Sequence, residues 1–397
     1  MTDDELRAEV SAWLEANWTE EDREYFKAPM ALRGPAPWFR RLLEAGWRVP
    51  AWPREWCGRD LSAQQTKIVQ REFARVKAPG AADPGIAAGT VFAFGSDELK
   101  HRMLAKFLTN EATACLLYSE PNAGSDLASV RTQAERRGDH YIVNGSKIWT
   151  SSARIADHGL LLARTNWDAP KHSGISFFIL PMHQKGVEVR PLRQITGESQ
   201  FNEVFFTDAI VPAENIVGEE GAGWKVLQTA LAYERQLMGS SEAGSAFAGD
   251  PLRMLRAAKA AGKLGDPLIR QNIARIMALK ELNALNMRRA TEEAALGTSS
   301  PIMSLGKLAM SRILHGEARV LTQIAGARSM LTGQSFPVEA AMNHQSLFVF
   351  INSIGGGSDQ IQRNIISERV LGLPREMEMD RDIPFRESRA VRAVPPR

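Results

Sequence analysis

The residues best suited to ligand binding lie between positions 113 and 152, which read TACLLYSEPNAGSDLASVRTQAERRGDHYIVNGSKIWTSS. An apolar run ends at Pro121, because proline has no N–H donor and a fixed φ. The turn that follows leaves backbone N–H groups and the hydroxyls of Ser119 and Ser125 able to face a ligand. Trp149 then stands beside three hydroxyl residues. A flat ring and short donors suit a planar ligand with a polar edge and a phosphate tail. The alternative is a β-hairpin with polar loops and a core tryptophan.

Glu234 is the carboxylate best placed for proton transfer. At about 100° per residue, its neighbours within about 60° on the helix are all apolar. These neighbours are Leu227, Ala230, Leu231, Leu237 and Met238, whereas Lys225, Gln228, Thr229 and Gln236 lie at or beyond about 120°. A buried carboxylate costs several kcal/mol unless it is paired or protonated, and such groups are common at functional sites. An ion pair with an arginine inside a helical bundle is the alternative.

The composition is that of an ordinary globular protein. The chain has 397 residues, of which 44% are hydrophobic and 24% charged, enough for two or three domains. Its net charge of +3 is too balanced to favour nucleic acid or a membrane as partner. Cys57 and Cys115 form no metal-binding spacing, and no metal site is predicted. The acidic N-terminus lacks the apolar segment of a signal peptide, and no apolar run could span a bilayer, so we expect a cytoplasmic protein.

Hydrophobic periodicity divides the chain into three regions. Residues 1–112 show helical spacing, residues 113–216 show short strands between Gly or Pro turns, and residues 217–397 show long amphipathic helices. The last region should hold helices at about 224–248, 267–295 and 304–332, with a final helix from Asp359. We therefore predict a mainly α chain with an inserted small β-barrel or sandwich and a C-terminal four-helix bundle.

Two local features are predicted from residue types. Ser62 should be the N-cap of a helix, because a serine hydroxyl can accept a hydrogen bond from a free N–H of the first turn. Residues 249–266, rich in Ala, Gly and Lys, should form a mobile connection.

The motifs between residues 113 and 152 resemble the flavin-binding middle domain of the acyl-CoA dehydrogenase family. They are Ser-Glu-Pro-x-Ala-Gly-Ser-Asp-Leu-Ala, Gly-Asp-x-Tyr and Asn-Gly-x-Lys-x-Trp-x-Ser. A Trp-Pro run from Trp52 to Ser62 resembles the family's N-terminal domain. The resemblance implies helical, β and helical domains in that order, and FAD-dependent desaturation of an acyl-CoA thioester between Cα and Cβ.

The resemblance also bears on the catalytic base. Many members carry a glutamate in a Tyr-Glu-Gly-Thr-Ser stretch, but here its position is Gly356, which has no side chain. Isovaleryl- and long-chain acyl-CoA dehydrogenases instead carry the glutamate on a C-terminal-domain helix, just before an arginine. Glu234, followed by Arg235, matches that pattern. The resemblance thus makes Glu234 the base for the Cα proton and Arg235 a substrate-binding residue.

The cofactor residues are carried over from the same resemblance. In the middle domain the residues implied for FAD are Leu116, Ser119, Gly124, Ser125, Trp149 and Ser151, with Ser125 also near the substrate. In the C-terminal region Gln323, Ser358 and Gln360 would serve the FAD of a neighbouring subunit. An Asp359–Gln362 capping box at the same helix start is compatible with that role.

Two family stretches that reach the partner subunit's FAD are altered. The Arg-x-x-Phe-Gly stretch is absent around residues 262–271, and the Gln-x-x-Gly-Gly stretch is reduced after Gln323. The implied partners are an acyl-CoA substrate, an electron-transfer flavoprotein, and either a homo-oligomer (dimer or tetramer) or a heterotetramer with a related subunit. Two alternatives stay open: a catalytically silent subunit of such a heteromer, and a flavin oxidase or monooxygenase on the same fold.

Overall fold

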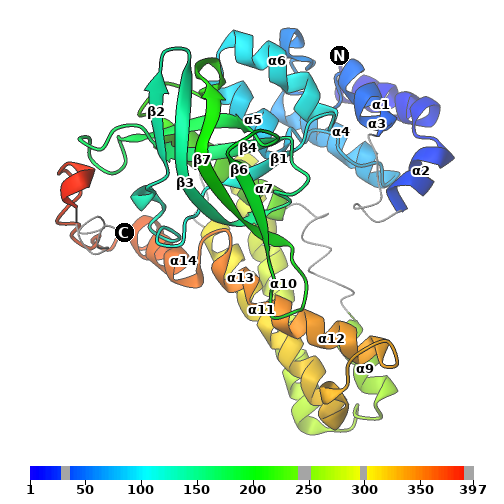
Figure 1. Cartoon of the computed structure of the whole chain (residues 1–397). Coiled ribbons are helices and arrows are strands. Elements are labelled where there is room, and N and C mark those ends of the chain that lie inside the picture. Colours follow the sequence, from blue (N-terminus) through cyan, green and yellow to red (C-terminus); the bar gives the residue numbers. More distant parts are fainter. Residues whose placement is uncertain (28–35, 240–251, 296–301, 389–397) are drawn as a thin grey trace. The chain divides into compact units, whose positions relative to one another are not determined.

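The computed structural model describes residues 1–27, 36–239, 252–295 and 302–388 (Figure 1). The chain forms two compact units, each described here by itself. The first comprises Met1–Leu192, Ser199–Glu234 and the segment from Asp380 onward. The second comprises Arg193–Glu198 and Arg235–Met379.

The first unit begins with short helices whose starts are set by side-chain caps. Thr2 and Ser62 each form a capping box, and Ser96 accepts a hydrogen bond from the backbone of Leu99. The prediction that Ser62 is an N-cap is therefore confirmed. The helices are α1 (Asp3–Asn17), α2 (Glu20–Lys27), α3 (Pro37–Glu44), α4 (Ala63–Arg75), α5 (Gly85–Phe94) and α6 (Asp97–Leu108).

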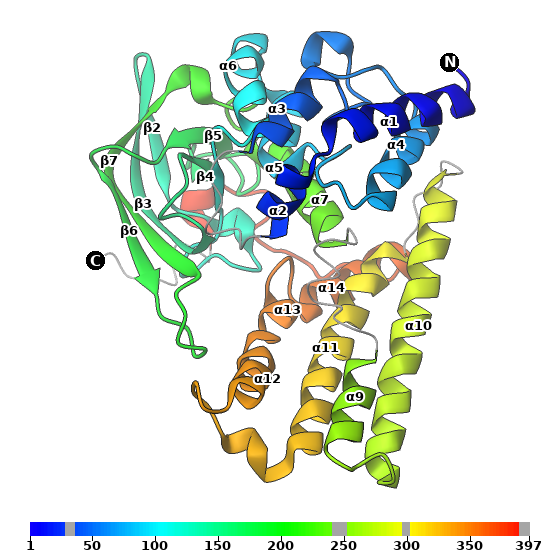
Figure 2. The same cartoon turned by 90° about the vertical axis from the view of Figure 1, so that its right-hand side faces the viewer.

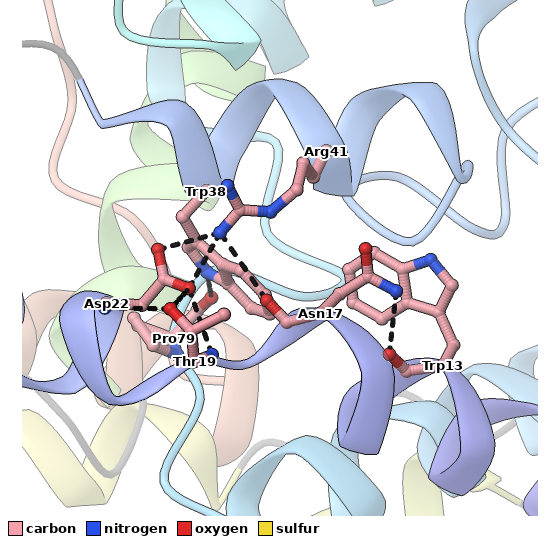
Figure 3. Close-up of polar contacts among 7 residues, drawn as sticks. All are labelled: Trp13, Asn17, Thr19, Asp22, Trp38, Arg41 and Pro79. Carbon is pink, nitrogen blue, oxygen red and sulfur yellow. Dashed lines mark hydrogen bonds and ion pairs between the residues drawn. The ribbon is translucent and has the colours of Figure 1, made fainter.

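Tryptophans fill the core beneath α1, α3 and α4. Trp38 is fully buried, lies 4.7 Å from Trp18 between ring centroids, and donates its indole N–H to the Pro79 carbonyl at 2.8 Å. Beside it, Arg41 binds the carboxylate of Asp22 at 2.7 Å (Figure 3). Asp22 also accepts hydrogen bonds from Thr19. Because Asp22 lies on α2 and Arg41 lies on α3, their ion pair joins the two helices.

The middle of the first unit is one curled seven-stranded sheet (Figure 1). Its order is β1-β4-β2-β3-β7-β6, with β5 paired to β4. β1 runs parallel to β4, whereas β3 and β7 form a long antiparallel pair. The strands are β1 (Ala114–Leu117), β2 (Gln133–Arg137), β3 (His140–Ser151), β4 (His158–Arg164), β5 (Ile175–Pro181), β6 (Val187–Leu192) and β7 (Phe201–Pro212).

Two further elements complete the first unit. Helix α7 spans Gly223–Gly239, and its residues up to Glu234 belong to this unit. It begins within one residue of the predicted start, while the predicted end at residue 248 lies outside the described residues. A segment near the end of the chain also belongs to this unit. In it Phe385 is fully buried, and the Arg164 guanidinium carbon lies 3.5 Å from the centroid of the Phe385 ring.

The second unit is helical, and α10 and α11 lie side by side along most of their length (Figure 2). Its apolar core joins residues of α9, α10, α11 and α12, including Met254, Ile273, Ile313 and Met342. The helices are α9 (Arg253–Ala260), α10 (Pro267–Ala295), α11 (Met303–Ala325), α12 (Pro337–Phe348), α13 (Ile351–Ile354) and α14 (Asp359–Ile365).

Three sequence predictions are corrected here. The connection expected at residues 249–266 contains α9, whose Met254 and Ala258 are buried in the core. The helix expected to reach residue 332 ends at Ala325, because Gly326 adopts a left-handed φ of 59°. The N-cap of α14 is Ser358 rather than Asp359, since the Ser358 hydroxyl accepts from the backbone of Ile361 at 3.3 Å.

Among the helices in the described ranges, none is both long and apolar enough to cross a membrane.

Candidate active site

A tight turn after β1 presents the first group of candidate residues. Glu120 and Ala123 exchange both backbone hydrogen bonds at 3.0 Å, which closes the turn around Pro121. Gly124 and Ser125 follow on the surface. A Cβ on Gly124 would meet no atom within 4 Å, so no neighbour within the described residues requires glycine there. The backbone of this turn is therefore open to close approach by a ligand.

A buried ion pair holds this turn against β3. The Lys147 ammonium donates to Glu120 Oε1 at 2.8 Å and to the Tyr118 carbonyl at 2.9 Å. Glu120 also accepts from the backbone N–H groups of Arg131 and Thr132. Burial favours a raised pKa for Glu120, but Lys147 and these N–H donors outweigh it and leave the pKa below its ordinary value. The Glu120 end of the turn is thus fixed by a buried charge pair.

A bulge in β3 turns Trp149 outward. The pairing of β3 with β7 shifts register between Lys147 and Thr150, and Trp149 takes a left-handed φ of 62°. Its indole is 59% exposed and meets the Phe201 ring edge-on at 5.9 Å between centroids. The backbone N–H of Ile148 donates to the Ser119 carbonyl at 2.9 Å. The bulge therefore brings the Trp149 region next to Ser119.

The serines around this bulge have free hydroxyls. Within the described part of the chain, the side chains of Ser119, Ser125 and Ser151 make no hydrogen bond to another residue. Ser125 and Ser151 are exposed and Ser119 is half-buried, as is Leu116 on β1. The predicted middle-domain residues thus offer an exposed indole and spare donors. We refer to Ser119, Ser125, Trp149 and Ser151 as the Trp149 surface.

Helix α7 presents the candidate carboxylate. Its Val226, Leu227 and Ala230 are fully buried, whereas Lys225 and Gln228 are exposed. The predicted apolar stripe is therefore confirmed as far as the structure describes it. Glu234 lies one turn beyond Ala230 on the same face and is half-buried. The side chains of Arg235, Leu237 and Met238 lie outside the described residues.

Sequence reasoning missed the contact that fixes α7 at this point. Gly89 on α5 has no room for a side chain, because a Cβ there would lie 2.7 Å from Cζ of Tyr233. The Tyr233 ring therefore packs directly on the α5 backbone, one residue before Glu234. A glycine inside the apolar run Gly85–Phe94 was the only signal in the sequence, and by itself such a glycine is ambiguous.

Models of three domains of one protein family match this chain in the same order, together spanning most of its length. The acyl-CoA dehydrogenase N-terminal, middle and C-terminal domain models match residues 2–111, 115–209 and 221–371. The chain is 36% identical over 393 residues to acyl-CoA dehydrogenase IpdE1 of Mycobacterium tuberculosis H37Rv, covering 94% of this chain and 98% of that protein. The chain belongs to the acyl-CoA dehydrogenase family. The predicted fold class, with a curled β-sheet domain between helical domains, is confirmed.

Solved acyl-CoA dehydrogenase structures agree with this assignment. The Tcur3481-Tcur3483 steroid ACAD has a TM-score of 0.73 and 28% identity, covering 94% of this chain and 98% of that chain. The ChsE4-ChsE5 complex from Mycobacterium tuberculosis has a TM-score of 0.68 and 29% identity, with the same coverage. Each of these two structures is named for a pair of proteins, Tcur3481 with Tcur3483 and ChsE4 with ChsE5.

The family implies FAD, and the Trp149 surface fits a flavin. An exposed indole on a strand bulge can cover a planar ring, and hydroxyls without partners can bond its polar edge. The open backbone at Gly124 allows close approach of a phosphate group.

The remaining family positions lie in the second unit and are described within it. Gln323 on α11 is exposed and accepts from Asn272 at 3.1 Å. Ser358 caps α14, and Gln360 is exposed in its first turn. Gly356 has a left-handed φ of 65°, which suits glycine and disfavours the glutamate of other acyl-CoA dehydrogenases.

Proposed function

We propose that this acyl-CoA dehydrogenase homologue catalyses FAD-dependent α,β-dehydrogenation of an acyl-CoA thioester, with Glu234 as the base. One observation carries the proposal. Glu234 continues a face of α7 that is otherwise apolar and buried, in the same unit as the Trp149 surface. Of the two positions at which members of the family carry the base, position 356 is a glycine here and position 234 is a glutamate.

Each residue has a defined task in this proposal. Glu234 takes the proton from Cα of the thioester, and its apolar neighbours Leu227 and Ala230 exclude water from that carboxylate. Trp149 would cover the flavin ring, Ser119 and Ser151 would bond its polar edge, and Ser125 would bond the pyrophosphate. Bound FAD supplies the acceptor for the hydride equivalent that leaves Cβ.

Leu116 and Gly124 would line the same cofactor surface. Gln323, Ser358 and Gln360 would serve the FAD of a neighbouring subunit. Arg235 would bind the substrate beside Glu234, and Ser125 would contact both ligands. The domain limits proposed for this organisation are residues 1–112, 113–216 and 217–397, in a protein of the cytoplasm.

The relatives suggest the substrate class and the assembly. A steroid acyl-CoA dehydrogenase built from two different subunits resembles this chain over 94% of its length. We therefore propose a bulky, ring-bearing acyl-CoA as substrate and a related chain as partner in a heterotetramer. A homo-oligomer is the simpler assembly. An electron-transfer flavoprotein would accept the electrons.

The experiment is anaerobic reduction of the purified holoprotein by a panel of thioesters. The panel includes octanoyl-CoA, cyclohexane-1-carbonyl-CoA and a steroid side-chain CoA thioester. The flavin absorbance should bleach with one of them in the wild type and in the matched variant Glu15→Gln, which changes an exposed glutamate of α1. It should not bleach in Glu234→Gln. Equal bleaching of Glu234→Gln would refute the base assignment.

A catalytically silent subunit is the second candidate, favoured by Gly356 and by the absence of the family's Arg-x-x-Phe-Gly stretch around residues 262–271. It predicts that the purified chain stays colourless when FAD is added. It also predicts that a co-expressed partner chain binds flavin and turns over the thioester. A yellow protein that bleaches on its own would eliminate this candidate.

A further inference from the structure

The tyrosine before the Ser119 turn is buried with an unused hydroxyl. Tyr118 is 6% exposed, and its ring lies 5.9 Å from the Phe177 ring between centroids. Its hydroxyl oxygen is buried and has no hydrogen-bond partner among the described residues. A buried hydroxyl without a partner destabilises the fold, because its lost hydration is not replaced. Such a group calls for an explanation, because a phenylalanine would fill the same space without that cost.

The surroundings of Tyr118 lead to the face of α7 that carries Glu234. Tyr118 belongs to the same apolar cluster as Leu227 and Ala230, and Leu231 packs against that cluster. Glu234 follows Ala230 at the i+4 position, so it extends the helix face that contributes Leu227 and Ala230 to this cluster. The tyrosine that follows β1 and the carboxylate of α7 therefore belong to the same region of the first unit.

The charged and titratable groups around Tyr118 are few in the described part of the chain. They are Glu234 from α7, Cys115 from the preceding strand β1, and Lys147 from β3, whose ammonium binds the Tyr118 carbonyl. Burial is the main cause that raises the pKa of Tyr118 well above its ordinary value, and the charges of Glu234 and Cys115 raise it further. The phenol thus keeps its proton at neutral pH and can act as a donor.

We propose that Tyr118 is a positioning residue for Glu234, donating its phenolic hydrogen to the carboxylate and orienting it toward the acyl group. This rests on the proposed role of Glu234 as base. Catalytic hydrogen bonds are often long in ligand-free proteins and tighten in the complex, so an unused donor at this place is what such a role requires. The hydrogen bond favours the ionised carboxylate and lowers its pKa.

The test is an infrared titration of the Glu234 carboxyl band in the holoprotein, identified by its loss in Glu234→Gln. In Tyr118→Phe the pKa of Glu234 should rise by about one unit, because a donor to the charged form is lost. In the matched variant Tyr233→Phe it should stay unchanged. Tyr233 adjoins Glu234 in sequence, but burial alone raises the pKa of its phenol. An unchanged pKa of Glu234 in Tyr118→Phe would overturn the proposal.

A second measurement covers the case in which Tyr118→Phe does not fold. The chain has only four tyrosines, so 3-fluorotyrosine can replace all of them. Fluorination makes the phenol a stronger donor, and the pKa of Glu234 should then fall. A pKa that stays in place would contradict the proposal.

The titration uses no substrate, so its result is separate from the proposed function. If Glu234→Gln still bleaches with a thioester, the base assignment fails whatever the titration shows. If Glu234→Gln does not bleach and the Tyr118→Phe titration matches the wild type, only the role of Tyr118 fails. If Tyr118 does orient Glu234, the pH dependence of the bleaching rate should change as well. The pH below which the rate falls should be about one unit higher in Tyr118→Phe than in the wild type.

Discussion

At the residue scale, the turn that carries Ser119 and Ser125 depends on charge buried beneath it. Lys147 is fully buried and Glu120 is 8% exposed, and each satisfies the other together with backbone groups. Arg164 lies nearby, fully buried, and donates to the carbonyls of Ala128 and Val130. The exposed candidate surface therefore rests on a rigid polar core, which is the support that a precise ligand site needs.

Removing one member of this pair should be costly. Glu120→Gln leaves the Lys147 ammonium buried without its counter-charge, so the free energy of unfolding should fall by about 3–5 kcal/mol. Urea unfolding at pH 7 measures this loss. A matched control is Glu15→Gln, at an exposed position, which should change the stability by less than about 0.5 kcal/mol.

The same variant has a defined pH dependence. The pKa of Glu120 is lowered in the folded chain, so its ionised form stabilises the fold fully above its unfolded pKa of about 4.5. That stabilisation is lost as the pH falls through the lower, folded value. The stability gap between wild type and Glu120→Gln should therefore be constant near neutrality and shrink below pH 4.5. A gap that widens in acid would contradict this assignment.

At the element scale, α7 carries the proposed base and α5 sets its position. Gly89 lets the Tyr233 ring of α7 lie directly against the α5 backbone, with no α5 side chain between them at this point. Helix α7 must hold its register here, because a small shift of its axis moves Glu234. Close packing of this kind transmits strain rather than absorbing it.

Gly89→Ala tests this contact. Alanine favours a helix by about 1 kcal/mol over glycine, but its Cβ would overlap the Tyr233 ring, and overpacking costs about 1–3 kcal/mol. We expect a net fall in thermal stability and a slower thioester-driven bleaching of the flavin. The double variant Gly89→Ala/Tyr233→Leu should recover part of the stability lost by Gly89→Ala. A single variant that is more stable than wild type would refute the contact.

At the scale of the whole molecule, the chain closes on itself within the first unit. The backbone N–H of Phe385 donates to Ala169 at 2.9 Å, and that of Arg386 donates to Trp167 at 3.1 Å. The Phe385 ring covers the Arg164 guanidinium in a cation–π contact between two fully buried side chains. The segment around Phe385, more than two hundred residues from Arg164 in sequence, thus covers the buried Arg164 charge.

Phe385→Ala should release this segment. Loss of a fully buried phenylalanine costs about 3–5 kcal/mol where the surroundings cannot collapse. Hydrogen exchange at the amides of residues 385 and 386 should accelerate, while exchange in α4 stays as in wild type. Slow exchange at both amides in the variant would show that the ring does not hold the segment.

The sequence predicted a large part of this structure because its signals were local. The starts of α7 and α14, both ends of α10 and the cap at Ser62 follow from periodicity and cap chemistry. The family motif around Trp149 identified the candidate surface, but not the bulge that exposes the indole. The Gly89–Tyr233 contact, the docking of Phe385 on Arg164 and the unused Tyr118 hydroxyl each join distant segments. No spacing rule could have revealed them.

The most direct test of the proposed base is exchange of the Cα protons of the thioester with solvent. The holoprotein is mixed in D₂O with the thioester that bleaches it, and deuterium at Cα is followed by NMR. The wild type should catalyse incorporation of deuterium, and Glu234→Gln should not, while both retain flavin. Incorporation by Glu234→Gln at the wild-type rate would show that another group removes the proton.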